Sequence, residues 1–274
     1  MGESERDGFS FVVVRVAPIY QILYTRYLLG GSVDTRIHRR FLAHIGDAIT
    51  NFAFPPWCLG CSEPGSWFCS NCRASVELLL LGWCGRCGRR ARAVTTLCQR
   101  CATELGLSAF ISAYPYRGAV ERVIRTMKYR PAQIGLSVLV AREPHDRLAA
   151  VVALASVVIP VPLHRDRERR RGFNQAEVLA KLLLTSVDQS RMQRHLIRLR
   201  ERPAQVGLDR RQRQANLAAA LTWRGPPLTG QTVCLVDDVI TTGATIAEAA
   251  RAVRAAGARW VLAVTLAQTP PDRK

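Results

Sequence analysis

The sequence lacks both an export signal and a run of residues that would cross a membrane. Three acidic residues stand within the first seven positions, where a signal peptide needs positive charge. The apolar stretch at residues 9–24 is interrupted by Arg15 and Pro18, and it falls short of the ~20 residues that a membrane-spanning helix needs. We therefore expect a cytoplasmic protein whose thiols stay reduced.

Acidic residues are also scarce. The chain has 21 Asp and Glu residues against 39 Lys and Arg residues, which leaves a formal net charge of +18. Such an excess favours polyanionic partners: phosphorylated substrates, nucleic acid or an acidic surface. Because 48% of the residues are hydrophobic and 22% are charged, the chain is expected to bury a core and not to stay disordered.

The nine cysteines are spaced for metal binding and not as a disulfide scaffold. Eight of them form four Cys-x-x-Cys pairs, and two such pairs supply four thiolates for one tetrahedral zinc ion. We expect a structural double zinc ribbon with sequential pairing, one ion held by Cys58, Cys61, Cys69 and Cys72 and the other by Cys84, Cys87, Cys98 and Cys101. A crossed pairing, a redox-active pair and an iron–sulfur cluster remain alternatives.

The pattern of apolar residues divides the chain into three parts. Residues 1–40 lack periodicity and are expected to form a flexible extension, and residues 41–106 combine a helix with the cysteine module. Residues 107–274 alternate strands and helices, which predicts an α/β fold with a parallel sheet flanked by helices. The expected strands cover residues 111–116, 157–161, 233–239 and 261–266, and the expected helices cover residues 119–129, 133–141, 174–185 and 245–256. Residues 191–224 are charged, and we expect a loop or hood over the site there.

The most informative segment is VCLVDDVITTGAT at residues 233–245. A short apolar strand ends at Asp237 and Asp238, at the edge where open α/β sheets bind ligands. The loop that follows opens a helix, so its backbone N–H groups lack intrahelical partners and can bind a phosphate. The carboxylates suit ribose hydroxyls, directly or through magnesium. The segment therefore predicts a site for a phosphorylated sugar, while two aspartates that only cap the loop are the alternative.

This segment resembles the phosphoribosyl-pyrophosphate-binding loop of type I phosphoribosyltransferases: an apolar strand, two acids, an apolar pair and Thr-Thr-Gly-x-Thr. The resemblance implies that Asp237 and Asp238 hold the ribose hydroxyls. It also implies that the 5′-phosphate is bound by Thr241, Thr242, Gly243, Ala244 and Thr245. The implied reaction is displacement of magnesium-bound pyrophosphate from the anomeric carbon by a nitrogen nucleophile.

From residue 41 to residue 267 the chain is similar to the ComF family of competence-associated phosphoribosyltransferases, in which a double zinc ribbon precedes a type I transferase domain. The matching motifs are PWCLGC at residues 56–61, KYR at 128–130, PVPL at 160–163 and RGFNQ at 171–175. The first forty residues have no counterpart in that family. The family implies a role in DNA uptake or related nucleotide metabolism.

Cationic residues near the expected strand ends are candidates for binding the pyrophosphate. Lys128 and Arg130 stand in a loop after an expected helix, and Arg171 ends an arginine-rich run that follows the strand at residues 157–161. Guanidinium groups bind phosphate oxygens in bidentate geometry, although a solvated charge run is the alternative. No residue is recognisable as a general base. We interpret His164 as a loop residue and not as a catalytic base.

Two further functions stay open. The basic charge and the zinc ribbons also suit a non-catalytic adaptor that binds single-stranded DNA together with DNA-uptake proteins. A regulator that senses the same phosphosugar without turnover is the third possibility.

Overall fold

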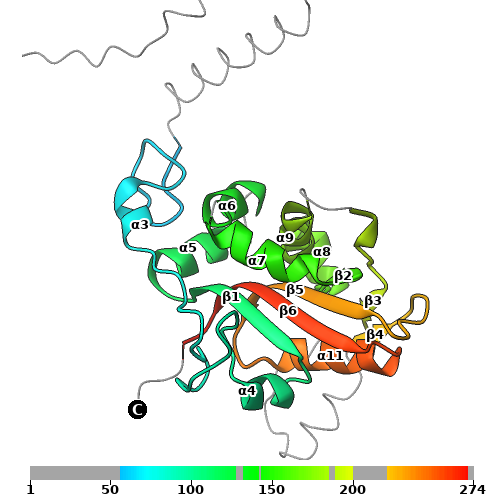
Figure 1. Cartoon of the computed structure of the whole chain (residues 1–274). Coiled ribbons are helices and arrows are strands. Elements are labelled where there is room, and N and C mark those ends of the chain that lie inside the picture. The colour runs from blue at the N-terminus through cyan, green and yellow to red at the C-terminus, as the bar shows by residue number, and fades with distance from the viewer. Residues whose placement is uncertain (1–55, 128–131, 142, 185–188, 200–220, 271–274) are drawn as a thin grey trace, which may run out of the picture. The chain divides into compact units, whose positions relative to one another are not determined.

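A computed structural model describes residues 56–127, 132–141, 143–184, 189–199 and 221–270 (Figure 1). All described residues belong to one compact unit, Pro56–Lys274. The expected N-terminal extension and the helix expected before Pro55 lie outside the described residues. No helix in the described part has the length and apolar character needed to cross a membrane.

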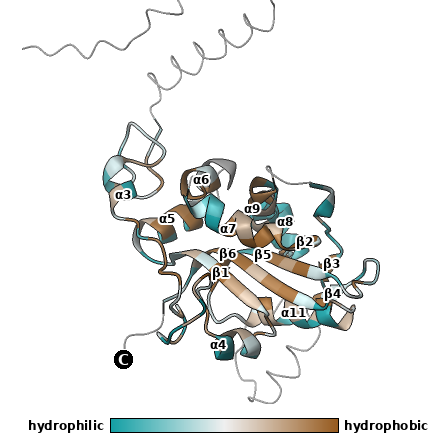
Figure 2. Cartoon of the chain, viewed as in Figure 1, coloured by the Kyte–Doolittle hydropathy of each residue, from teal (hydrophilic) through white to brown (hydrophobic). Residues whose placement is uncertain are grey.

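A four-stranded parallel sheet with the strand order β1-β6-β5-β2 lies at the centre of this unit. Its strands are β1 (Ala109–Pro115), β2 (Val157–Pro160), β5 (Thr232–Ile240) and β6 (Trp260–Gln268). The strands read as nearly continuous apolar runs because a parallel sheet is covered on both faces. Figure 2 shows this apolar character along the strands. The predicted α/β fold with a parallel sheet and flanking helices is confirmed.

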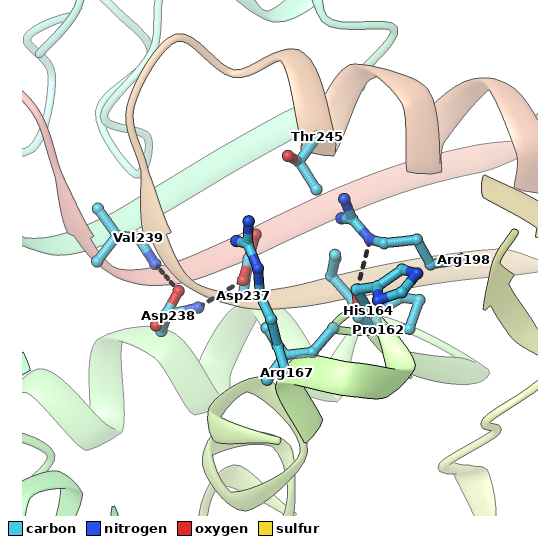
Figure 3. A pocket seen from close by; sticks show the side chains of 10 residues that line it. Pro162, His164, Arg167, Arg198, Asp237, Asp238, Val239 and Thr245 are labelled. Carbon is cyan, nitrogen blue, oxygen red and sulfur yellow. Dashed lines mark hydrogen bonds between the residues drawn. The ribbon is translucent and has the colours of Figure 1, made fainter. Parts of the chain in front are cut away.

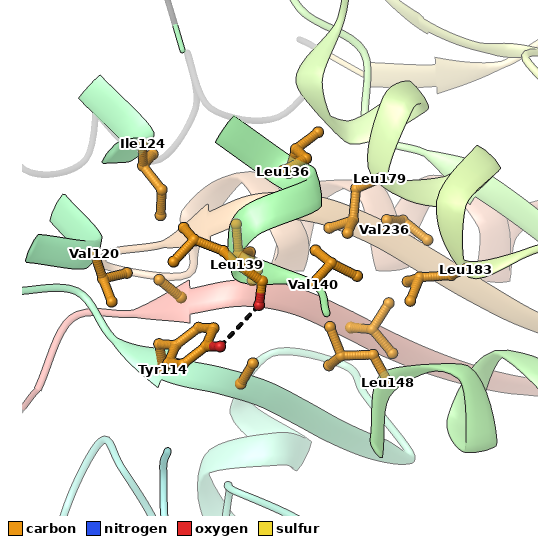
Figure 4. Close-up of a cluster of buried hydrophobic side chains, with 14 of the residues drawn as sticks. Tyr114, Val120, Ile124, Leu136, Leu139, Val140, Leu148, Leu179, Leu183 and Val236 are labelled. Atoms are coloured by element: carbon orange, nitrogen blue, oxygen red, sulfur yellow. Dashed lines mark hydrogen bonds between the residues drawn. The ribbon is translucent and has the colours of Figure 1, made fainter. Parts of the chain in front are cut away.

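The two faces of the sheet belong to separate hydrophobic cores, because successive residues of a strand point to opposite sides. In β5, Cys234 and Val236 belong to the first core, whereas Val233 and Leu235 belong to the second. The first core is covered by α5 (Gly118–Thr126), α6 (Ala132–Leu139), α7 (Glu143–Ala153) and α9 (Gln175–Leu183). In this core the Tyr114 hydroxyl donates a 2.8 Å hydrogen bond to the carbonyl oxygen of Leu139 (Figure 4).

The second core lies between the sheet and α11 (Ala244–Ala255), and it includes residues of α4 (Gln99–Glu104). Both helices lie on the face of the sheet opposite α7 and α9 (Figure 1). On the buried side of α11, Ala249 and Ala250 are fully buried. These small side chains let the helix approach the sheet closely.

Part of the expected hood at residues 191–224 is an antiparallel ribbon of β3 (Leu196–Arg198) and β4 (Leu221–Trp223). The ribbon contacts α11, and it follows a single 3₁₀ turn, η1 (Gln189–Arg191). Residues 200–220 lie outside the described part of the chain.

The expected helices omit α7, and they also omit α8 (Arg165–Arg171). All seven residues of α8 are charged and none is buried, so this helix has no apolar face that packs on the core. Its ends are instead stabilised locally. The His164 ring accepts a hydrogen bond from the Asp166 N–H, and Gly172 adopts a left-handed conformation after the last turn. Acidic residues in the first turn and arginines in the last complement the helix dipole.

Candidate active site and metal centres

The sheet opens a crevice between the carboxyl ends of β2 and β5. The helix α9, which follows β2, packs on one face of the sheet, while α11, which follows β5, packs on the other. Ligands of open α/β sheets bind where the connections diverge in this way. A cavity of about 230 Å³ lies there (Figure 3), lined by Val161, Pro162, Leu163, His164, Arg167, Arg198, Asp237, Asp238, Val239 and Thr245.

Two adjacent carboxylates stand on this cavity at the end of β5. The Asp238 N–H donates a 2.9 Å hydrogen bond to Oδ1 of Asp237, and the Val239 N–H donates a 2.7 Å bond to Oδ1 of Asp238. Burial and the neighbouring charge of Asp238 raise the pKa of Asp237 well above its ordinary value, while the Asp238 N–H and the Arg198 cation act in the opposite direction. A divalent cation would relieve this repulsion, so the pair has the donor chemistry of a magnesium site.

The segment that the sequence predicts to bind phosphate, residues 241–245, follows β5 and includes the start of α11; we call it the phosphate loop. Gly243 caps the helix with a φ of 82°, a left-handed conformation that glycine adopts without steric cost. The Thr242 hydroxyl accepts a 3.4 Å hydrogen bond from the Ala244 N–H. The N–H groups of the first turn of α11 have no hydrogen-bond acceptor within the helix, and the helix dipole is positive at this end. An anion can therefore bind there. Thr245 lines the cavity, whereas Thr241 and Thr242 are exposed and are not among its lining residues.

Two arginines from other elements also line the cavity. Arg167 comes from α8, and Arg198 ends β3. The Arg198 Nε atom donates a 3.1 Å hydrogen bond to the carbonyl oxygen of Pro162. Nothing in the sequence singles out Arg198, because a three-residue strand carries no readable periodicity. The single available signal is a cation within the charged stretch that we expect to form a hood.

The other predicted cations are placed differently. Arg171 is half-buried and donates a 3.3 Å hydrogen bond from Nη1 to Oε1 of Gln175, and it does not line the cavity. Lys128 and Arg130 lie outside the described residues. His164 lines the cavity, yet its Nδ1 atom accepts the 3.3 Å capping bond from the Asp166 N–H. This bond is in keeping with the interpretation of His164 as a loop residue.

The eight paired cysteines gather into two clusters of four, with the sequential pairing that their spacing predicts. Within each cluster the sulfur atoms lie within 4.8 Å of one another. A tetrahedron with Zn–S bonds of about 2.3 Å places its sulfurs about 3.8 Å apart. The Sγ atoms of Cys61 and Cys69 are 3.6 Å apart, and those of Cys87 and Cys98 are 3.7 Å apart. The side chains present therefore fit two zinc-ribbon sites.

Backbone amides prepare the buried thiols of both clusters for metal. Burial alone raises the pKa of Cys58, but the N–H groups of Cys69 and Gly60, each 3.4 Å from its sulfur, contribute to lowering it to about 6. The pKa of Cys84 is lowered to about 7 in the same way. In contrast, burial and the neighbouring thiols raise the pKa values of Cys72 and Cys101. A bound cation would compensate the charge of four gathered thiolates.

Comparison with known proteins gives a consistent picture. Residues 169–274 match the family model of the phosphoribosyl transferase domain. The DNA utilization protein YhgH of Escherichia coli O157:H7 is 31% identical over 220 residues, which cover 73% of this chain and 96% of that protein. Competence protein F of Haemophilus influenzae is 28% identical over 207 residues, 69% of this chain and 85% of that protein. Competence protein ComFC of Bacillus subtilis is 26% identical over 199 residues, 69% and 78% of the two chains. The cysteine clusters of this chain precede its phosphoribosyltransferase domain, and the chain belongs to the ComF family of competence and DNA-utilization proteins.

Proposed function

We propose that this protein binds phosphoribosyl pyrophosphate together with magnesium in the crevice between β2 and β5. The observation that supports this most strongly is that Asp237, Asp238 and Thr245 line one cavity, which joins a carboxylate pair to the N-terminal turn of α11. In this arrangement the acids hold the ribose hydroxyls, directly or through magnesium. The 5′-phosphate is bound by the phosphate loop: Thr241, Thr242, Gly243, Ala244 and Thr245.

Arginine and lysine side chains are our candidates for holding the pyrophosphate. Lys128, Arg130 and Arg171 are proposed from the sequence motifs, and Arg167 joins them because it lines the cavity. The guanidinium group of Arg198 faces the same cavity from the hood ribbon. Guanidinium groups suit this role because their N–H donors match phosphate oxygens in pairs.

The reaction that this site supports is transfer of the ribosyl group. The bond between the anomeric carbon and the pyrophosphate oxygen breaks, and pyrophosphate leaves with the electron pair. A nitrogen nucleophile forms the new bond and gives up a proton. Bound magnesium supplies charge neutralisation on the leaving group. The chain's own residues position the sugar and stabilise the separated charges.

The proposed setting is the cytoplasm, in DNA uptake or the nucleotide metabolism connected with it. Two of the relatives are named as competence proteins and one as a DNA utilization protein. We extend that role to this chain by similarity. Its partners would then be proteins of the DNA-uptake machinery.

A second candidate function is binding of single-stranded DNA without turnover. It is favoured by α8, whose residues Arg165, Arg167, Arg169 and Arg170 are all exposed. Filter binding of single-stranded DNA at several salt concentrations tests this function, since contacts with phosphates give a steep negative slope of log affinity against log salt. A flat salt dependence would remove it.

Isothermal titration with phosphoribosyl pyrophosphate and magnesium tests the main proposal. We expect magnesium-dependent binding by the wild type, and loss of about tenfold or more in affinity in Asp238→Ala, because a hydrogen bond to a charged group contributes about 1.5–3 kcal/mol. Asp146→Ala is the control, since Asp146 is an exposed carboxylate on α7 that does not line the cavity. Absence of wild-type binding, or equal binding by Asp238→Ala, would contradict the proposal.

A further inference from the structure

The phosphate loop packs on Leu105, which lies shortly after the last cysteine of the second cluster. Leu105 follows α4, the helix that carries Cys101 and begins after Cys98. A Cβ atom on Gly243 would lie only 2.7 Å from Cδ2 of Leu105, and 3.3 Å from its Cδ1. Both residues are buried, and Leu105 is 4% exposed. The loop backbone therefore packs directly on Leu105, at a distance that only glycine allows.

The other cysteine pair of the same cluster, Cys84 and Cys87, supports the end of the strand that leads into the loop. A Cβ atom on Gly85, which lies between Cys84 and Cys87, would be 3.0 Å from the side chain of Gln268. Gln268 is buried and pairs with Ile240, the last residue of β5 before the loop. The first cysteine pair of the second cluster therefore contacts the support of the loop, and the helix that carries Cys101 leads to Leu105, which contacts the loop itself.

Further contacts join α11, the helix that the loop opens, to the residues that follow α4. Arg254 of α11 donates a 2.8 Å hydrogen bond from Nε to the carbonyl oxygen of Gly106. Cys98, Cys101 and Leu105 belong to the same hydrophobic core as Ile240 and Ile246, which lie on either side of the loop. One continuous packed layer thus connects the second cluster with the loop.

The first cluster has no comparable contact among the described residues. Cys58 and Cys72 belong to the other core. Arg122 of α5 donates a hydrogen bond to the carbonyl oxygen of Gly60, within the first knuckle of this cluster. Both clusters consist of four cysteines, but they pack on different cores. A variant of one cluster can therefore serve as a control for a variant of the other.

We infer that the metal-loaded second cluster positions the phosphate loop through Leu105, and that emptying this cluster weakens binding of a phosphorylated ligand. The helix α4 has six residues, too few to hold its shape without outside constraint. Gathering the four thiolates around a metal supplies that constraint and fixes Leu105 under Gly243. The effect on the ligand rests on the proposed function, whereas the order of the loop does not.

Hydrogen exchange of the peptides covering residues 240–248 tests the order of the loop directly. The matched variants are Cys87→Ser and Cys61→Ser, because both cysteines are exposed and both stand second in the first pair of their cluster. We expect faster exchange in these peptides for Cys87→Ser and wild-type exchange for Cys61→Ser. Equal exchange in the two variants would overturn the inference.

A second pair of variants leaves every cysteine in place. Leu105→Ala removes the contact with Gly243, and Leu59→Ala makes the same change at a buried leucine of the first cluster. Isothermal titration with phosphoribosyl pyrophosphate should show a loss of affinity of about tenfold or more for Leu105→Ala, as displacement of a binding group by about 1 Å would cause. Leu59→Ala should bind as the wild type does, and both variants should retain their metal.

Equal weakening by the two leucine variants would overturn the inference, because it would show general destabilisation. If the wild type itself does not bind phosphoribosyl pyrophosphate, the proposed function fails. The exchange experiment still decides the inference in that case, because it needs no ligand. The two failures are therefore distinguishable.

Discussion

Arg198 and Pro162, 36 positions apart in the sequence, are joined by a 3.1 Å hydrogen bond from the arginine Nε atom to the proline carbonyl oxygen. The bond holds the β3–β4 ribbon against the segment that follows β2. It also places the guanidinium group on the cavity that contains Asp237, whose pKa this cation acts to lower.

Replacing Arg198 should therefore weaken binding of phosphoribosyl pyrophosphate. We expect a loss of affinity of about tenfold in Arg198→Ala, since one hydrogen bond to a charged group contributes about 1.5–3 kcal/mol. Arg198→Lys should restore only part of it, because the charge remains and the planar fork is lost. Isothermal titration measures both variants, with Arg259→Ala, an exposed arginine over Trp260, as the control. Wild-type affinity in Arg198→Ala would contradict this role.

Asp237→Asn should stabilise the fold in a pH-dependent way. Burial and the charge of Asp238 raise the pKa of Asp237 above its ordinary value of 3.8, so the folded state binds this proton more tightly than the unfolded state does. The free energy of unfolding therefore falls as the pH rises from about 3.8 through the raised pKa. Asp237→Asn does not lose unfolding free energy in this way, because asparagine has no carboxyl group to titrate.

Thermal unfolding of Asp237→Asn and the wild type, followed by circular dichroism at several pH values, measures the effect. The excess Tm of the variant should be small in acid and should grow towards neutral pH. The same variant should lose magnesium-dependent ligand binding. A Tm difference that does not grow with pH would show that the Asp237 proton is not linked to folding.

Two glycines with similar backbone angles should respond differently to alanine. Gly230 has a φ of 74° and open space around its Cβ position, so Gly230→Ala should cost about 1–2 kcal/mol of unfolding free energy from the left-handed conformation alone. Gly243 has a φ of 82° and also meets Leu105, so Gly243→Ala should cost at least about 1 kcal/mol more through overpacking. Denaturant titration compares the two. Equal losses would contradict the close packing under the phosphate loop.

Metal analysis of the purified protein should find about two zinc ions per chain, on the rule of four ligands to each closed site. Cys61→Ser and Cys87→Ser should each lower the zinc affinity of one cluster and leave the other loaded, because the clusters use separate side chains. Chelation should lower the Tm, since binding of a structural metal contributes to folding. A yellow-brown protein containing iron would contradict the zinc assignment.

The buried strands were the part of the fold that the sequence predicts best. Residues such as Val233 to Val236 form short continuous apolar runs, which are typical of a strand that is covered on both faces, and β2, β5 and β6 all lie where these runs predict them. The helix α8 could not be found in this way, because it buries no residue and carries no apolar stripe. Its signals are local: the capping His164, the left-handed Gly172 and arginines in the last turn.

The residues of the site likewise differ in whether the sequence can predict them. Asp237, Asp238 and Thr245 stand within one short segment, so a single strand–loop–helix unit brings them together and the sequence can predict it. Arg198 reaches the cavity only because the hood ribbon lies against the segment that follows β2. The contact of Leu105 with Gly243 likewise joins residues far apart in the sequence. Such contacts depend on the packing of elements, which one sequence does not encode in any local pattern.

A crystal structure of the complex with phosphoribosyl pyrophosphate and magnesium tests the central claim most directly. We predict the 5′-phosphate within hydrogen-bond distance of the backbone N–H groups of the phosphate loop, and the ribose hydroxyls beside Asp237 and Asp238. A ligand bound elsewhere, with the crevice between β2 and β5 empty at saturating concentration, would contradict the account.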